Sequence, residues 1–478
     1  MDCRSAPRSR SKPGPTALPP PNEPAAKFRR IDGKRRPVGD GGSKAPVVSN
    51  RAIWGLAVPA LGTLAVEPLY RLTDTAIIGR LGTVPLAGLA LAATVLGTLT
   101  FLCFFLTTGT TARVAFLTGQ GADRAAAEVV PQVLWVAAGL AIILTGLIVG
   151  LARPLANFVG GEPAVIDQAV IYLRISALAI PSILVAFVGN GWHRGRSDTR
   201  TPLTIVVVAN LINVVLEVVL VYGLDLGIAG SAVGTLIAQT VAGAWFLALL
   251  VKAVIDHGAG VRPHRTELTR VLRVARQMGL RSAGLLATLA LATAVASRIS
   301  AASLAAHQIA FEVFLFLALS VDALAVAAQA LVGTALGRGG GDEARAVGRQ
   351  IIRMGSIVGA ALTVLVLLTS QVIPRVFTSD AAVLDRASVA LIGLALMQIP
   401  AALAFVLDGI LEGASDFGFL QWALLGAMVA FAPFAVGVML RPELGLAGLW
   451  AGLFVWVSTR AALLTIRFRG PAWTGIAS

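Results

Sequence analysis

Long apolar segments, one after another along almost the whole chain, constrain the fold more than any other feature of the sequence. Runs of about 18 or more mostly apolar residues recur from Ala52 to Ile466. An α-helix of that length crosses the hydrocarbon core of a bilayer and satisfies its own backbone hydrogen bonds there. Only 13% of the residues are charged, about half the fraction found in soluble domains. The pattern therefore predicts an all-α integral membrane protein whose first partner is the lipid bilayer.

Gly, Pro and clusters of charged residues divide the apolar segments into about twelve predicted spans. Several of them exceed the roughly 20 residues needed to cross, which indicates tilting or extension beyond the lipid. We place the spans at residues 53–78, 84–117, 126–151, 165–190, 202–222, 228–252, 271–297, 304–336, 349–373, 384–411, 419–439 and 445–467.

The Lys and Arg residues, which give the chain a net charge of +14, are distributed as a membrane topology requires. Eleven of the 39 lie in the first fifty residues, and most of the others fall in short loops between spans. Basic residues at the inner ends outnumber those at the outer ends by about three to one, so both termini are predicted to be cytoplasmic. The distribution favours a multi-pass protein of the plasma (inner) membrane and argues against nucleic acid as a partner.

The chain ends, cysteines and histidines indicate no further chemistry. We expect residues 1–50, rich in Pro, Gly, Ser and basic residues, to form a disordered basic cytoplasmic tail, and 468–478 a short cytoplasmic tail. Cys3 and Cys103 make no disulfide framework, and the four histidines lack metal-ligand spacing. The H-x4-D spacing of His193 and Asp198 and the glycines at 337–342 resemble catalytic and phosphate-binding motifs only in outline. We therefore expect no enzymatic activity and no cofactor.

An internal repeat organises the spans. FVGNGWHRGRSD at 187–198 matches FVLDGILEGASD at 405–416, LGIAG at 226–230 matches LGLAG at 444–448, and two further pairs share the same offset of 218 residues. Four matches at one spacing predict two homologous lobes of about six helices, at 51–252 and 271–467, joined by a basic cytoplasmic linker at 253–270. Because six is an even number, the two bundles should be related by a pseudo-twofold axis along the membrane normal.

Charged side chains at membrane depth are costly and mark candidate sites, and the first predicted span holds several. Glu67, Tyr70 and Asp74 fall at i, i+3 and i+7, on one helix face, and Arg71 is spaced to pair with either acid. The alternative is an ion pair of Arg71 with Glu67 that satisfies only itself. Pro59 in the same span removes a backbone hydrogen bond and is a candidate hinge.

The fifth span carries the most informative pattern, NLINVVLE, in which Asn210, Asn213 and Glu217 again fall at i, i+3 and i+7. Two amides beside a carboxyl can hold a proton or a dehydrated cation, because amides serve either protonation state. The alternative is hydrogen bonding between helices. The predicted topology places Glu217 and Asp74 toward the outer ends of their spans, so the two carboxyls could share one cavity.

The second half of the chain carries other acids. Glu312 and Asp322 lie with Gln308 and Gln329 on one arc of the eighth span, and Asp408 lies at the repeat position of Asn190. These residues either contact an ion or substrate or serve only as polar packing between helices. Asp74 corresponds to Ala292 and Glu217 to Ala435. This asymmetry favours one lobe that couples to an ion while both shape a cavity.

Together these residues place the chain close to a known family. It resembles the multidrug and toxic compound extrusion (MATE) family, in its DinF-like branch, over about residues 51–467. The resemblance rests on EPLYRLTDTAIIGRLGTVPLA (67–87), RGRSDTRTP (194–202), NLINVVLE (210–217), AAHQIAFEVFLFLALSVDALAVAAQALVGTALGRG (305–339) and FVLDGILEGASD (405–416).

The resemblance implies twelve helices in two lobes around a central V-shaped cavity, with alternating access and exchange of a drug-like, often cationic, substrate for H⁺ or Na⁺. It implies that Pro59 is the first-helix proline, that Asp74, Asn213, Glu217 and Thr235 form the ion site, and that Asn190 matches a helix-4 asparagine. Where several relatives have Asp, this chain has Glu217, which puts Na⁺ coordination more in doubt than proton binding.

We therefore predict a monomeric secondary active antiporter that exports small organic, cationic compounds in exchange for H⁺, with Na⁺ as the alternative ion. The first rival is a flippase for lipid-linked precursors or polysaccharides, which would need a basic cavity. Arg71 and Arg174 are the only basic residues expected well inside spans, which disfavours it. A membrane enzyme and a purely structural protein are weaker alternatives.

Overall fold

A computed structural model describes residues 48–476, and within that range the chain is helical with short connections. Twelve helices or joined helix pairs are long and apolar enough to cross a membrane, as the sequence predicts. The elements are α1 (Asn50–Gly79), α2 (Thr83–Leu102), α3 (Phe105–Gly119), α4 (Asp123–Val159), α5 (Pro163–Ser176), η1 (Ala177–Ala179), α6 (Ile180–Gly195), α7 (Arg200–Val218), η2 (Val219–Gly223), α8 (Gly227–Asp256), α9 (Arg265–Ile299), α10 (Ala301–Gly337), α11 (Gly341–Thr369), α12 (Ile373–Phe377), α13 (Ala381–Gly413), α14 (Phe417–Leu440), η3 (Pro442–Leu444), α15 (Gly445–Arg469) and η4 (Ala472–Gly475). The tail predicted at 1–50 lies, up to residue 47, outside the described residues.

Spans that the sequence predicts as single helices are interrupted in the first half of the chain. The second span breaks between α2 and α3, where the amides of Cys103 and Phe104 donate to carbonyls three residues earlier. The Thr100 hydroxyl also donates to the Leu96 carbonyl at 2.8 Å, a contact that bends helices. The fourth span passes through a 3₁₀ turn, η1, and the fifth ends in a π turn, η2. Such irregular turns shift the phase of the side chains that follow.

The linker between the two halves is shorter than predicted. Helix α8 continues to Asp256 and α9 begins at Arg265, so the predicted 253–270 linker shrinks to 257–264. The arginines after Arg265 belong to a helical extension of α9. The sequence predicted a loop there because clustered charges indicate contact with water, and a helix that extends beyond the lipid has the same contact. Gln132 of α4 holds the linker by donating to the Arg262 carbonyl and accepting from the His264 amide, both at 2.8 Å.

The backbone repeats the 218-residue offset seen in the sequence. Residues 83–119 correspond to α10 at 301–337, and residues 163–195 correspond to α13 at 381–413. Left-handed residues recur at the same offset: Gly121 with Gly339, Ser197 with Ser415, and Gly227 with Gly445. Since an L-residue such as serine rarely adopts positive φ, the Ser197–Ser415 pair is a specific sign of one repeated turn.

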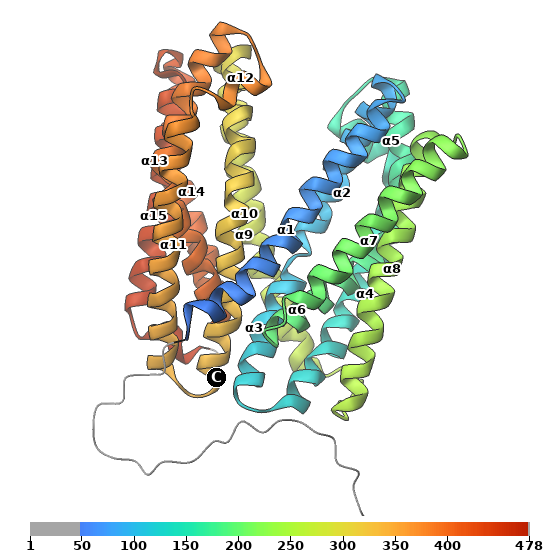
Figure 1. The fold of residues 1–478 in the computed structure, drawn as a ribbon, viewed down its shortest axis with the longest axis vertical. Coiled ribbons are helices and arrows are strands. Elements are labelled where there is room, and N and C mark those ends of the chain that lie inside the picture. The colour runs from blue at the N-terminus through green and yellow to red at the C-terminus, as the bar shows by residue number, and fades with distance from the viewer. Residues whose placement is uncertain (1–47, 477–478) are drawn as a thin grey trace, which may run out of the picture. The chain divides into compact units, whose positions relative to one another are not determined.

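Two helical bundles result, which we name the N-lobe (α1–α8, residues 50–256) and the C-lobe (α9–α15, residues 265–469) (Figure 1). They meet mainly where α1 and α3 pack against α10. Repeat partners face each other in this contact: a methyl group on Gly333 would lie 2.9 Å from Ala115 Cβ, and one on Gly337 would overlap the Phe116 carbonyl beside Gly119. Contact between repeat partners is what a pseudo-twofold axis between the lobes requires.

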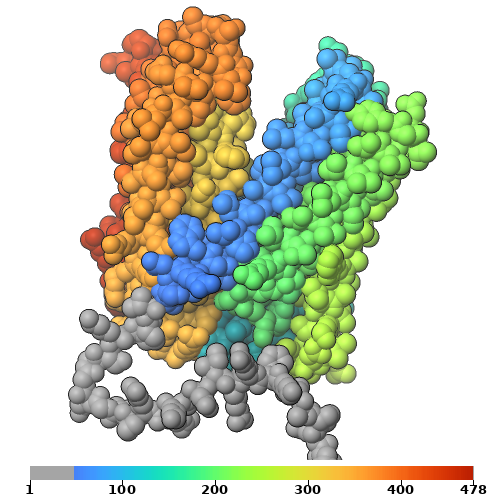
Figure 2. All heavy atoms as spheres, in the orientation of Figure 1, coloured from blue at the N-terminus to red at the C-terminus, as the bar shows by residue number. Residues whose placement is uncertain are grey.

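The lobes separate away from this contact. Figure 2 shows the upper parts of the two lobes diverging, with an open cleft between the yellow and orange part of the C-lobe on one side and α1, in blue, on the other. Helix α1 links both sides, because its first turns lie against the C-lobe, where Gln350 donates to the Val48 carbonyl at 2.7 Å, and its last turns pack with α7 and α2. A movement of α1 can therefore act on both lobes.

Candidate functional site

Two carboxyl groups meet inside the N-lobe, where α1, α7 and α8 converge. Asp74 comes from α1, Glu217 from the last turn of α7, and Ser231 from the first turns of α8. The Ser231 hydroxyl lies 2.7 Å from Asp74 Oδ1 and 3.2 Å from Glu217 Oε1, so it bridges the two carboxyls. We call Asp74 and Glu217 the acid pair. The structure thus brings together the two acids that the sequence predicts in one cavity.

Other polar groups complete the surroundings of the acid pair. Asn213 Nδ2, one turn before Glu217, donates to Glu217 Oε1 at 3.0 Å. The Tyr70 hydroxyl lies 2.8 Å from Thr235 Oγ1 and donates to Glu217 Oε1 at 3.5 Å. Side chains from three helices, Tyr70 of α1, Asn213 of α7 and Ser231 of α8, therefore meet at the Glu217 carboxylate.

The acid pair is buried and has no basic counterion. Asp74 is 5% exposed and Glu217 is fully buried. None of the ion pairs among residues 48–476 includes either acid. Glu217 Oε2 and Asn213 Oδ1 are buried acceptors that have no hydrogen-bond partner in the described part of the chain. Two ionised carboxylates would therefore share the hydrogens of Ser231, Asn213 and Tyr70 and would still face two unsatisfied acceptors, an arrangement that a bound proton or cation would relieve.

Four other predicted residues of the N-lobe do not join the acid pair. Asn210 donates back to the Val206 carbonyl at 2.7 Å, and Asn190 donates to the Ala186 carbonyl at 3.1 Å. Both amides therefore satisfy their own helices. Arg71 pairs with Glu67 at 2.6 Å, with both side chains more than half exposed, so this pair satisfies itself away from Asp74.

Helix α1 runs unbroken through two prolines. The predicted hinge Pro59 and a second proline, Pro68, both lie within Asn50–Gly79. The Thr63 hydroxyl donates to the Pro59 carbonyl at 3.1 Å. Each proline lacks a backbone N–H, so the helix has two weakened turns between its contact with α10 and Asp74.

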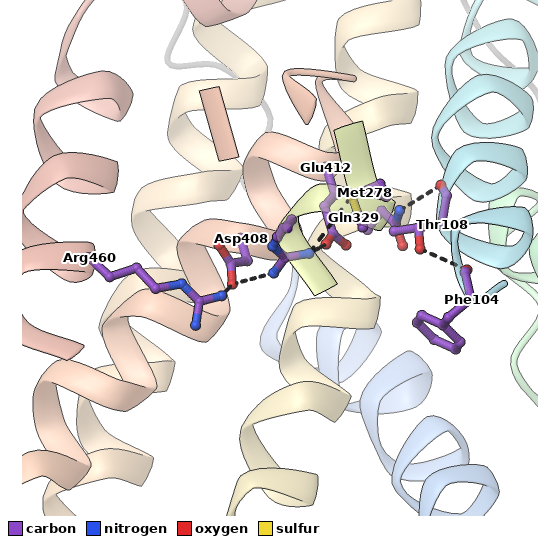
Figure 3. A network of polar contacts seen from close by, with 8 residues as sticks. Phe104, Thr108, Met278, Gln329, Asp408, Glu412 and Arg460 are labelled. Carbon is purple, nitrogen blue, oxygen red and sulfur yellow. Dashed lines mark hydrogen bonds and ion pairs between the residues drawn. The ribbon is translucent and has the colours of Figure 1, made fainter. Parts of the chain in front are cut away.

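A second group of buried charges lies in the C-lobe (Figure 3). Arg281 of α9 donates to Asp408 at 2.8 Å and to Glu412 at 2.8 Å, and Arg460 of α15 also donates to Asp408. We call these four residues the charge cluster. Its two arginines balance its two acids, so the predicted residue Asp408 is held in ion pairs.

Further charges surround the charge cluster. Asp322 of α10 lies within electrostatic reach of Arg281 and Arg460, and also of Arg194 from the N-lobe helix α6. Arg194 is only 5% exposed. The prediction that Arg71 and Arg174 are the only basic residues well inside spans is therefore wrong. The sequence shows how close an arginine lies to a charged loop, but it does not show whether the side chain is buried. For this reason the buried arginines were assigned to the inner loops.

The remaining predicted acid, Glu312, lies apart from both groups. Its carboxylate accepts from Gln308 Nε2 at 2.8 Å on an exposed part of α10. Gln329, on the predicted arc, instead donates to the Thr108 carbonyl of α3 at 2.9 Å and so ties the two lobes together (Figure 3). The arc thus divides into an exposed end and a packed end.

The discounted motif at His193 and Asp198 is a helix cap. His193 Nδ1 lies 3.0 Å from Asp198 Oδ2, while Asp198 Oδ1 accepts from the amides of Arg200 and Thr201 at 3.1 Å. Burial by itself would raise the pKa of Asp198, but the hydrogen bonds from His193 and Thr201 outweigh burial and lower that pKa overall. The geometry stabilises the start of α7.

Sequence reasoning missed several members of both groups. Ser231 lies in the small-residue segment GSAVG, which reads as helix packing. Tyr172 of α5 is buried beside Tyr70 and Thr235. A usable signal existed, because the chain has only three tyrosines and the third, Tyr222, donates to the Ile77 carbonyl of α1 at 2.6 Å, one turn beyond Asp74. The three tyrosines, on three different spans, all lie close to the acid pair or one turn beyond it.

Known proteins share this arrangement of helices. The fold is similar to that of a solved structure described as MATE in the bent conformation, with a TM-score of 0.82 and 21% identity, over 88% of this chain and 94% of that chain. It is also similar to a MOP superfamily transporter from Pyrococcus furiosus, with a TM-score of 0.80 and 20% identity, over 88% of this chain and 95% of that chain. At these identities the likeness shows the fold.

The sequence comparisons show the family. The chain is 30% identical to DNA damage-inducible protein F of Escherichia coli over 434 residues, which covers 89% of this chain and 94% of that protein. It is 29% identical to protein DETOXIFICATION 44 of Arabidopsis thaliana, over 85% and 80% of the two chains. The MatE family model matches residues 59–219 and 283–436, the major parts of both lobes. The chain therefore belongs to the MATE family of multi-pass membrane transporters.

Proposed function

We propose that this protein is a secondary active antiporter that exports small organic, cationic compounds in exchange for H⁺. The observation that carries this proposal is the acid pair, two buried carboxyls bridged by one hydroxyl and facing no basic side chain in the described chain. A buried charge without a counterion is unstable, so such a site favours the bound ion and changes character when the ion leaves.

The count of hydrogens supports H⁺ over Na⁺. The Ser231 hydrogen can serve only one of the two carboxyls at a time, and the donors Asn213 and Tyr70 reach only Glu217 Oε1. A proton on one carboxyl would therefore supply a hydrogen bond that the pair otherwise lacks. Thr235, the predicted fourth ion ligand, is already engaged with Tyr70. Na⁺ remains the alternative ion, supported by the free oxygens Asn213 Oδ1 and Glu217 Oε2.

Helix α1 would carry the coupling. Asp74 lies near one end of α1, while the other end packs on the C-lobe, with Pro59 and Pro68 between them. When protonation removes the charge of Asp74, α1 is free to adopt a second bend, and the cleft between the lobes changes with it. Ion uptake and substrate release then bias the same two-state element, as coupled transport requires.

The charge distribution supports an orientation with both termini cytoplasmic in the plasma membrane. The lobes touch at the end of the molecule where α3 ends and α4 begins, beside Gly119, which the predicted topology places inside. The open cleft would then face outward, toward the side from which the proton arrives. Since the acid pair and both lobes belong to one chain, we expect a monomer to be functional.

The charge cluster gives little support to the flippase alternative. A pyrophosphate would need free basic groups, whereas Arg281 and Arg460 both donate to acids of the charge cluster. Transport without catalysis fits the acid pair best.

Liposomes containing the purified protein would test the proposal. Ethidium uptake would be followed under an imposed pH gradient or an imposed Na⁺ gradient, for the natural chain, Asp74→Asn, Glu217→Gln and the control Glu312→Gln. The proposal predicts uptake driven by the pH gradient that both site variants lose and the control retains. Uptake driven only by Na⁺ would replace H⁺ with Na⁺. No uptake of any organic cation under either gradient would overturn the export proposal.

A further inference from the structure

A pocket of about 410 Å³ lies on the C-lobe, between the first turns of α11, the last turns of α15 and α13. It is separate from the acid pair and from the cleft between the lobes. Its lining combines basic and apolar side chains, and we call it the arginine pocket. The residues that line it are Arg345, Arg349, Ile352, Leu403, Thr465, Phe468 and Arg469.

The basic side chains of the arginine pocket are not neutralised. Arg345 donates to the Gly470 carbonyl at 3.0 Å, a contact that fixes the side chain without cancelling its charge. Within residues 48–476, Arg349 and Arg469 take part in none of the ion pairs. Among the described residues, two acids precede Arg345 on α11: Glu343 is paired with Arg338 at 3.1 Å, and Asp342 is exposed one turn before Arg345. The pocket therefore presents three positive charges from two helices.

The apolar floor of the pocket is held rigid. Phe468 packs so closely over Gly348 that a methyl group there would lie 2.7 Å from its ring. Its other face stacks on Trp473, with ring centroids 5.4 Å apart, and the Trp473 indole donates to the Phe468 carbonyl at 2.8 Å. Since Trp473 is fully buried, the turn that follows α15 holds Phe468 in place.

An exposed stripe on α11 leads away from the pocket. Arg349, Arg353, Ile357, Val364 and Leu368 follow at intervals of four and seven residues, so they share one helix face. The two arginines come first, and the apolar members are 61%, 55% and 76% exposed. In a membrane protein, exposed apolar side chains on an outer helix contact acyl chains, while arginines at the helix end lie at the headgroup level.

We propose that the arginine pocket binds an anionic phospholipid, with its phosphate on Arg345, Arg349 and Arg469 and an acyl chain along Ile357, Val364 and Leu368. Guanidinium groups bind phosphate oxygens in bidentate fashion, and basic pockets beside spans attract anionic headgroups. A free phosphate ion would use the arginines and leave the apolar stripe unused. The continuity of charge and apolar stripe along one face of α11 therefore identifies a lipid as the occupant.

Native mass spectrometry of the full chain in detergent would test this proposal, with phosphatidylglycerol or phosphatidylcholine added. The test variant is Arg349→Gln with Arg469→Gln, and the matched control is Arg273→Gln with Arg276→Gln, two exposed arginines of α9 near the same end of the molecule. We expect the natural chain to retain phosphatidylglycerol in preference to phosphatidylcholine. The test variant should bind it roughly tenfold or more weakly, since each basic residue near an anionic surface contributes about 1 kcal/mol. The control should bind as the natural chain does.

A second arm separates the lipid from soluble anions. Inorganic phosphate at millimolar concentration should leave bound phosphatidylglycerol in place, and Ile357→Ser should weaken lipid binding without altering phosphate binding. Equal loss of lipid in the test and control variants would mean diffuse attraction and overturn the proposal. Displacement of the lipid by inorganic phosphate would also overturn it, because the pocket would then be a soluble-anion site.

Discussion

The N-lobe and the C-lobe share one backbone plan but use buried charge in opposite ways. Within residues 48–476 the acid pair of the N-lobe has no counterion, whereas every acid of the charge cluster in the C-lobe is paired with an arginine. The repeat positions make the contrast explicit. The C-lobe has Ala292 for Asp74, Ala435 for Glu217 and Leu449 for Ser231, and the N-lobe has Thr63 for Arg281, Asn190 for Asp408 and Ala242 for Arg460.

The contrast separates two physical roles of buried charge. Acids paired with arginines are already neutral as a group, so they hold helices together and gain little from an added ion. Buried acids without a counterion are stable only when a proton or cation is bound, so their environment changes when that ion binds or leaves. The charge cluster is therefore a static group, and the acid pair is one that can exchange an ion. No residue of one group has the repeat position of a residue in the other.

The largest expected effect of a substitution in the acid pair is on transport. Asp74→Asn and Glu217→Gln should each reduce proton-driven transport to background while leaving the fold intact, because neutral side chains keep the hydrogen bonds but cannot release a proton. Neither change should lower the free energy of unfolding in detergent–SDS mixed micelles. A marked loss of stability in either variant would show that the acid pair is structural and would break the contrast.

The next effect concerns the stability of the C-lobe. Arg460→Met removes one of the two partners of Asp408 and leaves excess buried negative charge. We expect the free energy of unfolding to fall by about 3–5 kcal/mol, the usual cost of breaking a buried pair. Arg441→Met, the same substitution at an exposed arginine, is the control and should have little effect. Equal stability of the two variants would contradict the static role of the charge cluster.

A smaller effect concerns the contact between the lobes. In Gly337→Ala the new methyl group would overlap the Phe116 carbonyl of α3, so the lobes must move apart where repeat partners now touch. We expect a loss of about 1–3 kcal/mol in unfolding free energy together with slower transport. Gly139→Ala in α4 has open space around its methyl group and should be neutral or slightly stabilising.

The smallest effect concerns the tyrosine beside the acid pair. Tyr70→Phe removes the contact with Thr235 at 2.8 Å and the longer one with Glu217. A hydrogen bond of this kind contributes about 0.5–1.5 kcal/mol, so transport should fall less than about tenfold. Tyr222→Phe, which loses only a bond to the Ile77 carbonyl, serves as the comparison. A complete loss of transport in Tyr70→Phe alone would mean that the hydroxyl itself binds the ion.

The sequence predicted which N-lobe side chains come together better than it predicted the buried C-lobe charges, for a physical reason. Asp74, Asn213 and Glu217 stand out because each interrupts an apolar run, and helical spacing assigns them to faces. Ser231 is small enough to pass as helix packing, and only the fold brings it between the acids. Arg281 and Arg460 lie near charged segments, so a count of charges by loop placed them outside the membrane. In the structure Arg460 is buried and the Arg281 side chain is only 17% exposed.

The internal repeat explains why the fold itself was largely predictable. Twelve apolar spans, an offset of 218 residues and an even number of helices per lobe determine the bundle plan. The breaks between α2 and α3 and at η1 were not predictable, because the residues there are apolar and compatible with a helix. Their repeat counterparts in α10 and α13 are unbroken, so local sequence alone does not decide where a span bends.

Substrate-triggered proton release would show directly whether the acid pair exchanges a proton for substrate. Ethidium would be added to the purified natural chain in weakly buffered detergent solution, and the protons released would be followed with a pH-sensitive dye. We predict release by the natural chain, none by Asp74→Asn with Glu217→Gln, and undiminished release by Glu312→Gln. Binding of ethidium to the natural chain without proton release, or equal release by the double variant, would contradict the account.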